Sequence, residues 1–226
     1  NSTNLENKID HILGNVCEFK KLKNVVDQKR PEIIFHLAAQ SLVYDSFVRT
    51  KETYLTNLIG SVNLFEILKE YNGVKALIFF TSDKCYENNE KQKFFIETDR
   101  LGGKDPYSAS KACQEILFWS YKNSFFKNLP AATVRFGNVL GGGDFAKNRI
   151  IPDFIKSIKK KNIIIRQPNS IRPWQFVLEP LRGCLDLTLK LSKNNPEYYS
   201  PWNFGPLLDQ QITVKELVIK ANKKLE

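Results

Sequence analysis

Short apolar runs alternate with longer amphipathic stretches along most of this chain. The predicted strands cover residues 33–37, 74–82, 131–136 and 163–166. The predicted helices cover residues 20–29, 48–71, 106 or 107 to 126, 151–160, 178–191 and a last stretch from Val214. Strands that alternate with helices in this way indicate an α/β fold with a parallel sheet.

The predicted helix over residues 48–71 carries an apolar stripe that we expect to face the core. The stripe consists of Leu55, Leu58, Ile59, Val62, Phe65 and Leu68. Polar or small residues stand at the carboxyl ends of three of the predicted strands, at 36–40, 81–84 and 137–138. Because the carboxyl ends of parallel strands meet at one edge of a sheet, we expect a single site there.

Tyr107 and Lys111 stand four residues apart at the start of a predicted helix. This spacing brings both side chains to one helix face, although it also occurs on many solvated faces. A lysine ammonium beside a phenol favours the phenolate, so we expect the pKa of Tyr107 to fall from ~10 towards neutrality. Such a tyrosine can take the proton of a sugar hydroxyl while a hydride leaves the same carbon.

Ser82, Asp83 and Lys84 close the strand predicted over 74–82 and can supply an acid and a base beside the tyrosine. Asp83 acts as an acid only if its pKa is raised, and Lys84 acts as a base only when neutral. An ion pair between them would instead hold both charged. A turn with a satisfied aspartate and an exposed lysine is the other interpretation.

The composition narrows the function classes. Net charge is +10, with 42% hydrophobic and 26% charged residues, which is ordinary for a globular protein. The basic surface fits plain solvation or anionic ligands such as nucleotide diphosphates, and the aromatic residues do not interleave with it as in nucleic-acid-binding motifs. No apolar run approaches the ~18 residues of a membrane span. Four scattered cysteines and two histidines lack metal-ligand spacing, so we expect no metal site and a reducing cytoplasm.

Several motifs together resemble the extended short-chain dehydrogenase/reductase family. Within it they resemble the nucleotide-sugar 4,6-dehydratases whose substrate is CDP-glucose. The motifs are Phe35–Gln40, Thr56–Asn57, Thr81–Asn88, Leu101–Lys111, Gly137–Asp144, Arg149–Asp153 and Ile171–Gln175. They span roughly residues 14–206. The strings Ser-Asp-Lys-Cys-Tyr and Ile-Arg-Pro-Trp-Gln are the most specific of them, whereas the tyrosine–lysine pair points only to the wider family.

The resemblance implies a Rossmann-like parallel sheet that is incomplete at its N-terminus. Residues 1–137 would form a partial NAD-binding domain. Residues 138–226 would form most of a smaller, interleaved substrate-binding region, with segments that return to the Rossmann core. It also implies a cytoplasmic homodimer that makes a deoxysugar for surface polysaccharide such as lipopolysaccharide, with no nucleic-acid or membrane partner.

The resemblance also implies a mechanism with NAD as cofactor and CDP-glucose as substrate. Tyr107 takes the O4 proton and Lys111 holds the cofactor ribose, with Ser82 hydrogen-bonded near O4. Lys84, or a group that it assists, removes the C5 proton, and Asp83 protonates the departing 6-hydroxyl. The further residues it implies are Asn15, Val16, Ala38, Ala39 and Asn57 at the cofactor and Asn138, Arg149, Arg166 and Arg172 at the substrate.

The chain departs from the family pattern in several places. The glycine-rich dinucleotide fingerprint does not occur, and the stretch Gly14–Val16 matches a later strand of the family. We therefore expect the strand at 33–37 to have an open edge and the chain to bind NAD poorly. Asn15 replaces a usual aspartate, and Lys91, Lys93 and Ile96 replace two tryptophans and an arginine. A nucleotide-sugar 4-epimerase and a non-catalytic nucleotide-sugar-binding protein remain alternatives.

Overall fold

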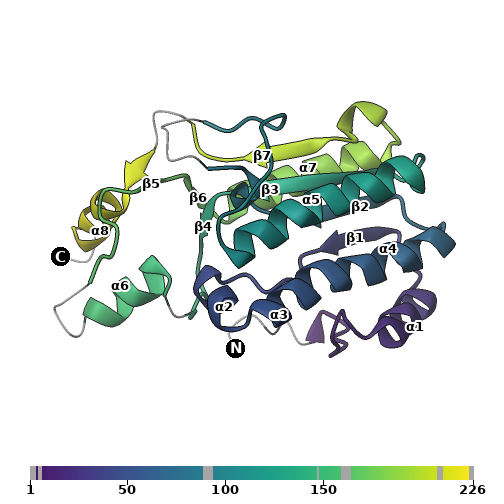
Figure 1. The fold of residues 1–226 in the computed structure, drawn as a ribbon, viewed down its shortest axis with the longest axis horizontal. Helices are drawn as coiled ribbons and strands as arrows, with labels where there is room; N and C mark the ends of the chain where they lie inside the picture. Colours follow the sequence, from purple (N-terminus) through teal and green to yellow (C-terminus); the bar gives the residue numbers. More distant parts are fainter. Residues whose placement is uncertain are drawn as a thin grey trace.

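A four-stranded parallel sheet forms the centre of the computed structural model, which describes residues 4, 7–88, 94–146, 148–158, 164–207 and 211–223 (Figure 1). Its strands, in spatial order, are β1 (Ile33–His36), β2 (Ala76–Phe80), β3 (Ala131–Phe136) and β7 (Pro201–Phe204). The predicted α/β class with a parallel sheet is confirmed. The first three strands lie where they were expected, whereas β7 was not predicted.

Helices cover both faces of this sheet (Figure 1). The helices α1 (Phe19–Lys29), α4 (Gly60–Glu70) and α5 (Pro106–Ser124) lie on one face, and α7 (Leu178–Ser192) lies on the other. Successive side chains of β2 alternate between the two cores, because side chains of a strand point to opposite faces. Leu77 and Phe79 enter the core with α4 and α5, whereas Ala76 and Ile78 pack against α7.

The segment before α4 is broken into short helices. It contains α2 (Val43–Val48), α3 (Thr50–Tyr54) and a π-helical turn, η2 (Leu55–Ile59). The predicted apolar stripe is therefore only partly right: Phe65 and Leu68 are buried, but Leu55 and Ile59 are 43% and 44% exposed. The π turn accommodates an extra residue, so the inward face ahead of it is displaced along the sequence. That inward face carries polar residues instead.

A smaller group of elements lies to one side of the sheet, at the left of Figure 1. In it β4 (Asn138–Leu140) pairs in parallel with β6 (Trp174–Phe176), and β5 (Ile171–Arg172) pairs antiparallel with β8 (Ile212–Thr213). The helices α6 (Ile150–Ile158) and α8 (Val214–Asn222) complete the group. Two further 3-10 turns are η3 (Asp83–Cys85) and η4 (Pro196–Tyr198).

Two of the expected strands do not form within the described residues. Residues 164–166 are not a strand, and Ile163, where this strand was expected to begin, lies outside the described part of the chain. Lys159 and Lys160, at the end of the helix predicted over 151–160, lie outside it as well. Residues 14–16 form a loop and the beginning of a turn instead of the strand suggested by the family. Lys91 and Lys93 also lie outside the described part of the chain.

The strand β1 lies at the edge of the sheet and, within the described residues, pairs only with β2. Ile33 and Phe35 are 46% and 38% exposed there. Within the described residues β1 is thus an edge strand with partly exposed apolar side chains, as expected. Weak binding of NAD stays a prediction.

Candidate active site

The first turn of α5 places Tyr107 at the carboxyl edge of the sheet. Asp105 caps this helix: its carboxylate accepts hydrogen bonds from the backbone N–H and the hydroxyl of Ser108, at 2.9 and 2.6 Å. Pro106 occupies the first helical position, where its lack of an N–H costs nothing. The backbone N–H of Tyr107 donates to the Ser46 hydroxyl at 3.2 Å, and the tyrosine side chain is buried.

Lys111 lies one helical turn later on the same face, as predicted. Its side chain is buried, and its ammonium donates to the carbonyl of Phe80, the last residue of β2, at 3.3 Å. The Lys111 nitrogen is 6.0 Å from the centroid of the Tyr107 ring. The fold therefore joins the tyrosine–lysine pair to the end of β2, which leads directly into Ser82.

The predicted fall in the Tyr107 pKa is wrong for this structure. Burial raises the pKa of Tyr107 to about 12, although the hydrogen bond with Ser82 and the charge of Arg149 act in the opposite direction. Lys111 offers its ammonium to a backbone carbonyl instead of to the phenol. Burial lowers the pKa of Lys111 to about 8, and the charge of Glu115 opposes that shift. The phenol is consequently protonated at neutral pH.

Ser82, Asp83 and Lys84 gather at the end of β2. Ser82 caps η3 by accepting the backbone N–H of Lys84 at 3.2 Å, and its hydroxyl donates to Asp83, also at 3.2 Å. The Lys84 ammonium contacts the two carboxylate oxygens of Asp83 at 3.3 and 3.4 Å. The ion pair considered as an alternative from the sequence is thus present.

The residues implied for the cofactor differ in accessibility. Ala38 is exposed and Ala39 half-buried, directly after β1, so both can approach a ligand at this edge. Asn15 is exposed and accepts a hydrogen bond from the backbone N–H of Cys17 at 2.9 Å. Val16 is half-buried, and its carbonyl accepts a hydrogen bond from Asn63 at 2.9 Å.

Asn57 braces the site from within, and its contact with the cofactor stays a prediction. It lies in the π turn, is fully buried, and uses both ends of its side chain inside the protein. Its oxygen accepts the backbone N–H of Gln40 at 2.8 Å, and its nitrogen donates to the Gln40 carbonyl and to Ser110, at 3.2 and 2.8 Å. Asn57 thereby links the loop after β1 to α5.

The residues implied for the substrate lie on the smaller group of elements. Asn138 opposite Trp174 pairs β4 with β6, and Arg172 lies two residues before Trp174. Arg149 forms an ion pair with Asp144 at 3.1 Å, and its charge acts on Tyr107. Arg166 is exposed and donates to the Asn148 carbonyl at 3.3 Å.

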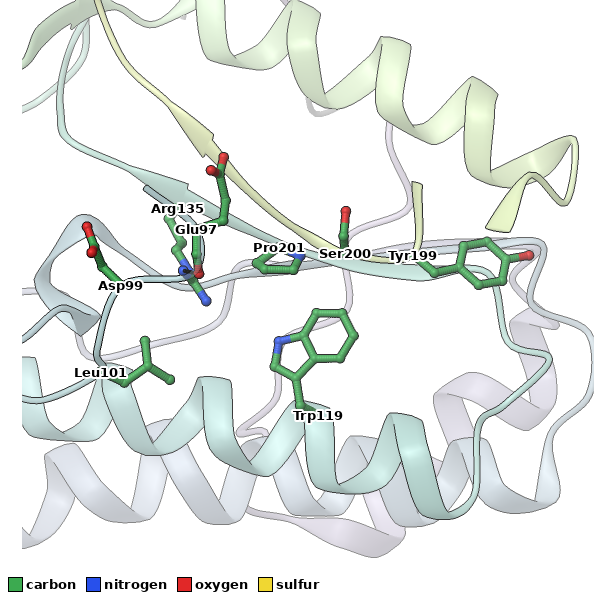
Figure 2. A pocket seen from close by; sticks show the side chains of 8 residues that line it. All are labelled: Glu97, Asp99, Leu101, Trp119, Arg135, Tyr199, Ser200 and Pro201. Carbon is green, nitrogen blue, oxygen red and sulfur yellow. Dashed lines mark hydrogen bonds between the residues drawn. The ribbon is translucent and has the colours of Figure 1, made fainter. Parts of the chain in front are cut away.

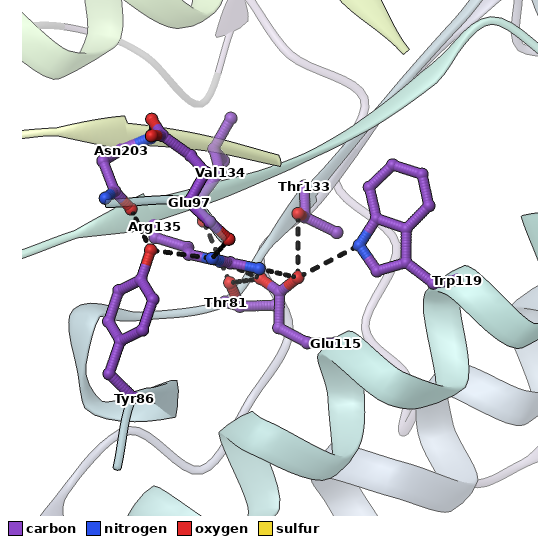
Figure 3. A network of polar contacts seen from close by, with 9 residues as sticks. All are labelled: Thr81, Tyr86, Glu97, Glu115, Trp119, Thr133, Val134, Arg135 and Asn203. Carbon is purple, nitrogen blue, oxygen red and sulfur yellow. Dashed lines mark hydrogen bonds and ion pairs between the residues drawn. The ribbon is translucent and has the colours of Figure 1, made fainter. Parts of the chain in front are cut away.

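A buried ion pair beneath the site was not predicted. Glu115 and Arg135 are 0% and 3% exposed at their side chains and lie 2.8 Å apart, as Figure 3 shows. An arginine inside the otherwise apolar run of β3 was the available signal, because a buried arginine requires a partner. Glu115, four residues after Lys111 on α5, was the matching signal.

A cavity of about 390 Å³ lies on the other side of this ion pair (Figure 2). Its lining residues are Glu97, Asp99, Leu101, Trp119, Arg135, Tyr199, Ser200 and Pro201. On α5, Trp119 is twelve residues from Tyr107, which corresponds to ~18 Å along the helix axis. This cavity is therefore separate from the tyrosine–lysine site.

The family now follows from comparison with known proteins. A sequence profile of the NAD-dependent epimerase/dehydratase family matches residues 1–200. The chain belongs to this family. Its match to the profile covers β1, β2 and β3 with the site at their carboxyl ends, so the tyrosine–lysine pair and the Ser82–Lys84 turn lie within the family region.

Individual relatives include sugar-nucleotide dehydratases. The chain is 42% identical to a CDP-glucose 4,6-dehydratase of Salmonella typhimurium over 96% of this chain and 62% of that protein. It is 32% identical to a dTDP-D-glucose 4,6-dehydratase of Dictyostelium discoideum over 78% of this chain and 42% of that protein. The chain thus spans less than two thirds of the length of either relative.

Solved structures share the fold. A dTDP-glucose 4,6-dehydratase of Bacillus anthracis in complex with NAD superposes with a TM-score of 0.79 at 23% identity, covering 100% of this chain and 68% of that one. A UDP-glucose 4-epimerase of Thermotoga maritima with UDP-glucose gives a TM-score of 0.80 at 22% identity, covering 93% and 66%. At these identities the similarity establishes the fold alone, which two different reactions share.

The described residues show neither a metal site nor a membrane-spanning helix. Among the described residues no three side chains of His, Cys, Asp or Glu gather as a metal site would require. Within the same residues, every helix is too short or too polar to cross a bilayer.

Proposed function

We propose that this protein is a 4,6-dehydratase of CDP-glucose that uses NAD as its cofactor. The observation that carries the proposal is the Ser82-Asp83-Lys84 turn beside Tyr107 and Lys111, in a chain 42% identical to a CDP-glucose 4,6-dehydratase over 96% of its length. The product would be CDP-4-dehydro-6-deoxyglucose.

The described residues suit the ribose and nicotinamide half of the cofactor. The small residues Ala38 and Ala39 follow β1, where a ligand must approach the backbone closely. The Nε2 atom of the buried His36 has no hydrogen-bond partner at the same edge. Lys111 brings an ammonium to this edge and can donate to ribose hydroxyls as well as to the Phe80 carbonyl. When bound, NAD takes up a hydride from C4 of the sugar and later returns it to C6.

In the proposed first step Tyr107 accepts the proton of the sugar O4. Because burial raises the pKa of Tyr107 to about 12, this step requires the bound substrate and cofactor to lower that pKa. Ser82 and Arg149 already act in that direction. The resulting 4-keto group makes the C5 proton acidic.

The next step needs an acid and a base on the C5–C6 bond. Lys84 removes the C5 proton and Asp83 protonates the 6-hydroxyl, which leaves as water. The Lys84 nitrogen lies 3.3 Å from an Asp83 carboxylate oxygen, close enough for a proton to pass between them. Passage of a proton from Lys84 to Asp83 would give the neutral amine and the carboxylic acid that the step uses. Asn138, Arg166 and Arg172 hold the nucleotide diphosphate in this proposal.

Because we expect NAD to bind weakly, the test is incubation of the purified protein with CDP-glucose at an NAD concentration shown by titration to saturate it, followed by the alkaline absorbance of a 4-keto sugar and by NMR of the product. We expect conversion of CDP-glucose in preference to dTDP-glucose and UDP-glucose. Conversion to the C4 epimer, or binding of CDP-glucose without turnover, would contradict the proposal.

The substitution Asp83→Asn separates a dehydratase from an epimerase, because an epimerase does not expel the 6-hydroxyl. We expect a loss of about 10²- to 10⁴-fold in dehydration, the usual contribution of a general acid. The matched control is Asp186→Asn on the exposed surface of α7, which should leave the rate unchanged. An unchanged rate of epimerisation at C4 in Asp83→Asn would favour the epimerase.

We further propose a cytoplasmic homodimer in deoxysugar synthesis for surface polysaccharide. The four cysteines Cys17, Cys85, Cys113 and Cys184 are free, which suits a reducing compartment. The exposed apolar residues Tyr44, Phe47 and Val48 of α2 offer a surface for a second copy, next to α5 with its exposed Ile116. Light scattering of Phe47→Glu tests the dimer: the variant should be monomeric, and an unchanged dimer would exclude this surface.

A further inference from the structure

The carboxylate of Glu115 is fully buried and accepts hydrogen bonds from four residues (Figure 3). Arg135 donates two, from Nε at 2.9 Å and from a terminal nitrogen at 2.8 Å. Thr133 donates at 3.0 Å and Trp119 at 3.3 Å. The remaining donor is the hydroxyl of Thr81. This set satisfies a buried charge that would otherwise be very costly.

The Thr81 contact differs from the others in where it acts. Thr81 directly precedes Ser82 and Asp83 at the end of β2, whereas Thr133 lies inside β3, between β2 and β7. Glu115 is one helical turn beyond Lys111 on α5. The Thr81–Glu115 hydrogen bond therefore joins the strand end that carries the acid to the helix that carries the tyrosine.

The partner side of the ion pair anchors the same point to the rest of the fold. The second terminal nitrogen of Arg135 donates to the Tyr86 hydroxyl at 2.7 Å and to the Glu97 carbonyl at 3.0 Å. Tyr86 in turn donates to Asn203 of β7 at 2.6 Å. Glu115 is thus tied through Arg135 to β3, to the segment before α5 and, by way of Tyr86, to β7.

We propose that the Thr81–Glu115 hydrogen bond positions the reactive end of β2 against the reactive face of α5. Thr81 and Glu115 are then positioning residues, not catalytic ones, because they act through Ser82 and Asp83. The kinetic consequence rests on the proposed dehydratase function. The structural consequence, the position of the end of β2 relative to α5, does not rest on it, because this position is a property of the fold itself.

The test compares two substitutions of equal chemistry. Thr81→Val and Thr133→Val each remove one buried hydroxyl that donates to Glu115. We expect Thr81→Val to lower kcat for CDP-glucose by about 10- to 100-fold at an unchanged KM, the effect of a misplaced reacting group. Thr133→Val should stay within about threefold of the unaltered protein, and Thr81→Ser, which keeps the hydroxyl, should recover most of the rate. Equal losses in both valine variants would reduce the contact to general stability and overturn the proposal.

Crystal structures of the same variants give a readout that does not depend on the reaction. Ser82 should shift against Tyr107 by more than the roughly 0.5 Å tolerance of a reacting group in Thr81→Val, and not in Thr133→Val. An unmoved Ser82 would overturn the proposal even if catalysis fell. If the unaltered protein fails to convert CDP-glucose while Ser82 still shifts, the proposed function falls and the positioning role stands. Thr81→Ser covers the case in which the valine variant does not fold: it should fold and keep Ser82 in place, and a shifted Ser82 in it would also overturn the proposal.

Discussion

Removal of Arg135 tests the physical description of the buried network most directly. The substitution Arg135→Met keeps a long side chain in the core but leaves the carboxylate of Glu115 without its cation. Both side chains are almost fully buried and lie 2.8 Å apart, so solvent cannot replace the lost charge. Breaking one half of a buried pair typically costs about 3–5 kcal/mol, which is a large share of the ~5–15 kcal/mol that stabilises a folded domain.

The assay is urea unfolding followed by tryptophan fluorescence and circular dichroism. The matched control is Arg100→Met, which removes an arginine whose ion pair with Glu87 has a similar distance of 3.1 Å but an 84% exposed side chain. That variant should lose no more than about 1 kcal/mol of unfolding free energy, because exposed pairs contribute little. The double variant Glu115→Leu with Arg135→Met should lose less than the sum of the single losses, with a coupling energy of about 1–3 kcal/mol. If Arg135→Met costs no more than Arg100→Met, the reasoning is refuted.

Three further predictions concern single residues around the site. His36 is buried beside Lys111, and burial lowers its pKa to about 4. The histidine of the unfolded chain binds a proton at higher pH, so the free energy of unfolding should fall by up to about 3 kcal/mol as the pH drops from 6.5 to 4. In urea unfolding at several pH values, His36→Phe should lose this acid dependence. Burial lowers the pKa of Lys111 to about 8, so its charged form destabilises the fold below that pH. The free energy of unfolding should therefore rise between pH 8 and 10 relative to that of Lys111→Met. A difference between the two proteins that does not change with pH would contradict the burial of this charge. A Cβ added at Gly103 would lie 2.2 Å from a backbone nitrogen in the first turn of α5, whereas Gly142 has open space around it. Gly103→Ala should therefore lower the midpoint of thermal unfolding by several degrees, and Gly142→Ala should not. Equal midpoints would show that the first turn of α5 can shift to make room for the methyl group.

The sequence was sufficient for the elements that bury a regular apolar face. The predicted strands at β1, β2 and β3 and the helices at α1, α5, α6, α7 and α8 appear close to their expected bounds, because period-2 and period-3.6 patterns follow directly from burial of one face. The grouping of Tyr107, Lys111 and Ser82 also followed, since carboxyl ends of parallel strands must meet. Sequence could not predict β7, because this four-residue strand begins with Pro201 and its apolar alternation is limited to two residues, Trp202 and Phe204.

Only the tertiary structure decided the charges and the register around the site. Spacing alone placed Lys111 beside Tyr107, but burial and the direction of the ammonium set their pKa values, and both depend on residues far along the chain. The π turn at Asn57 and the Glu115–Arg135 pair arise in the same way, from contacts across 17 to 53 residues and across 20 residues of sequence. Local patterns record which face of an element is buried. Desolvation and hydrogen bonding depend on what lies against that face, and packing of distant segments determines this.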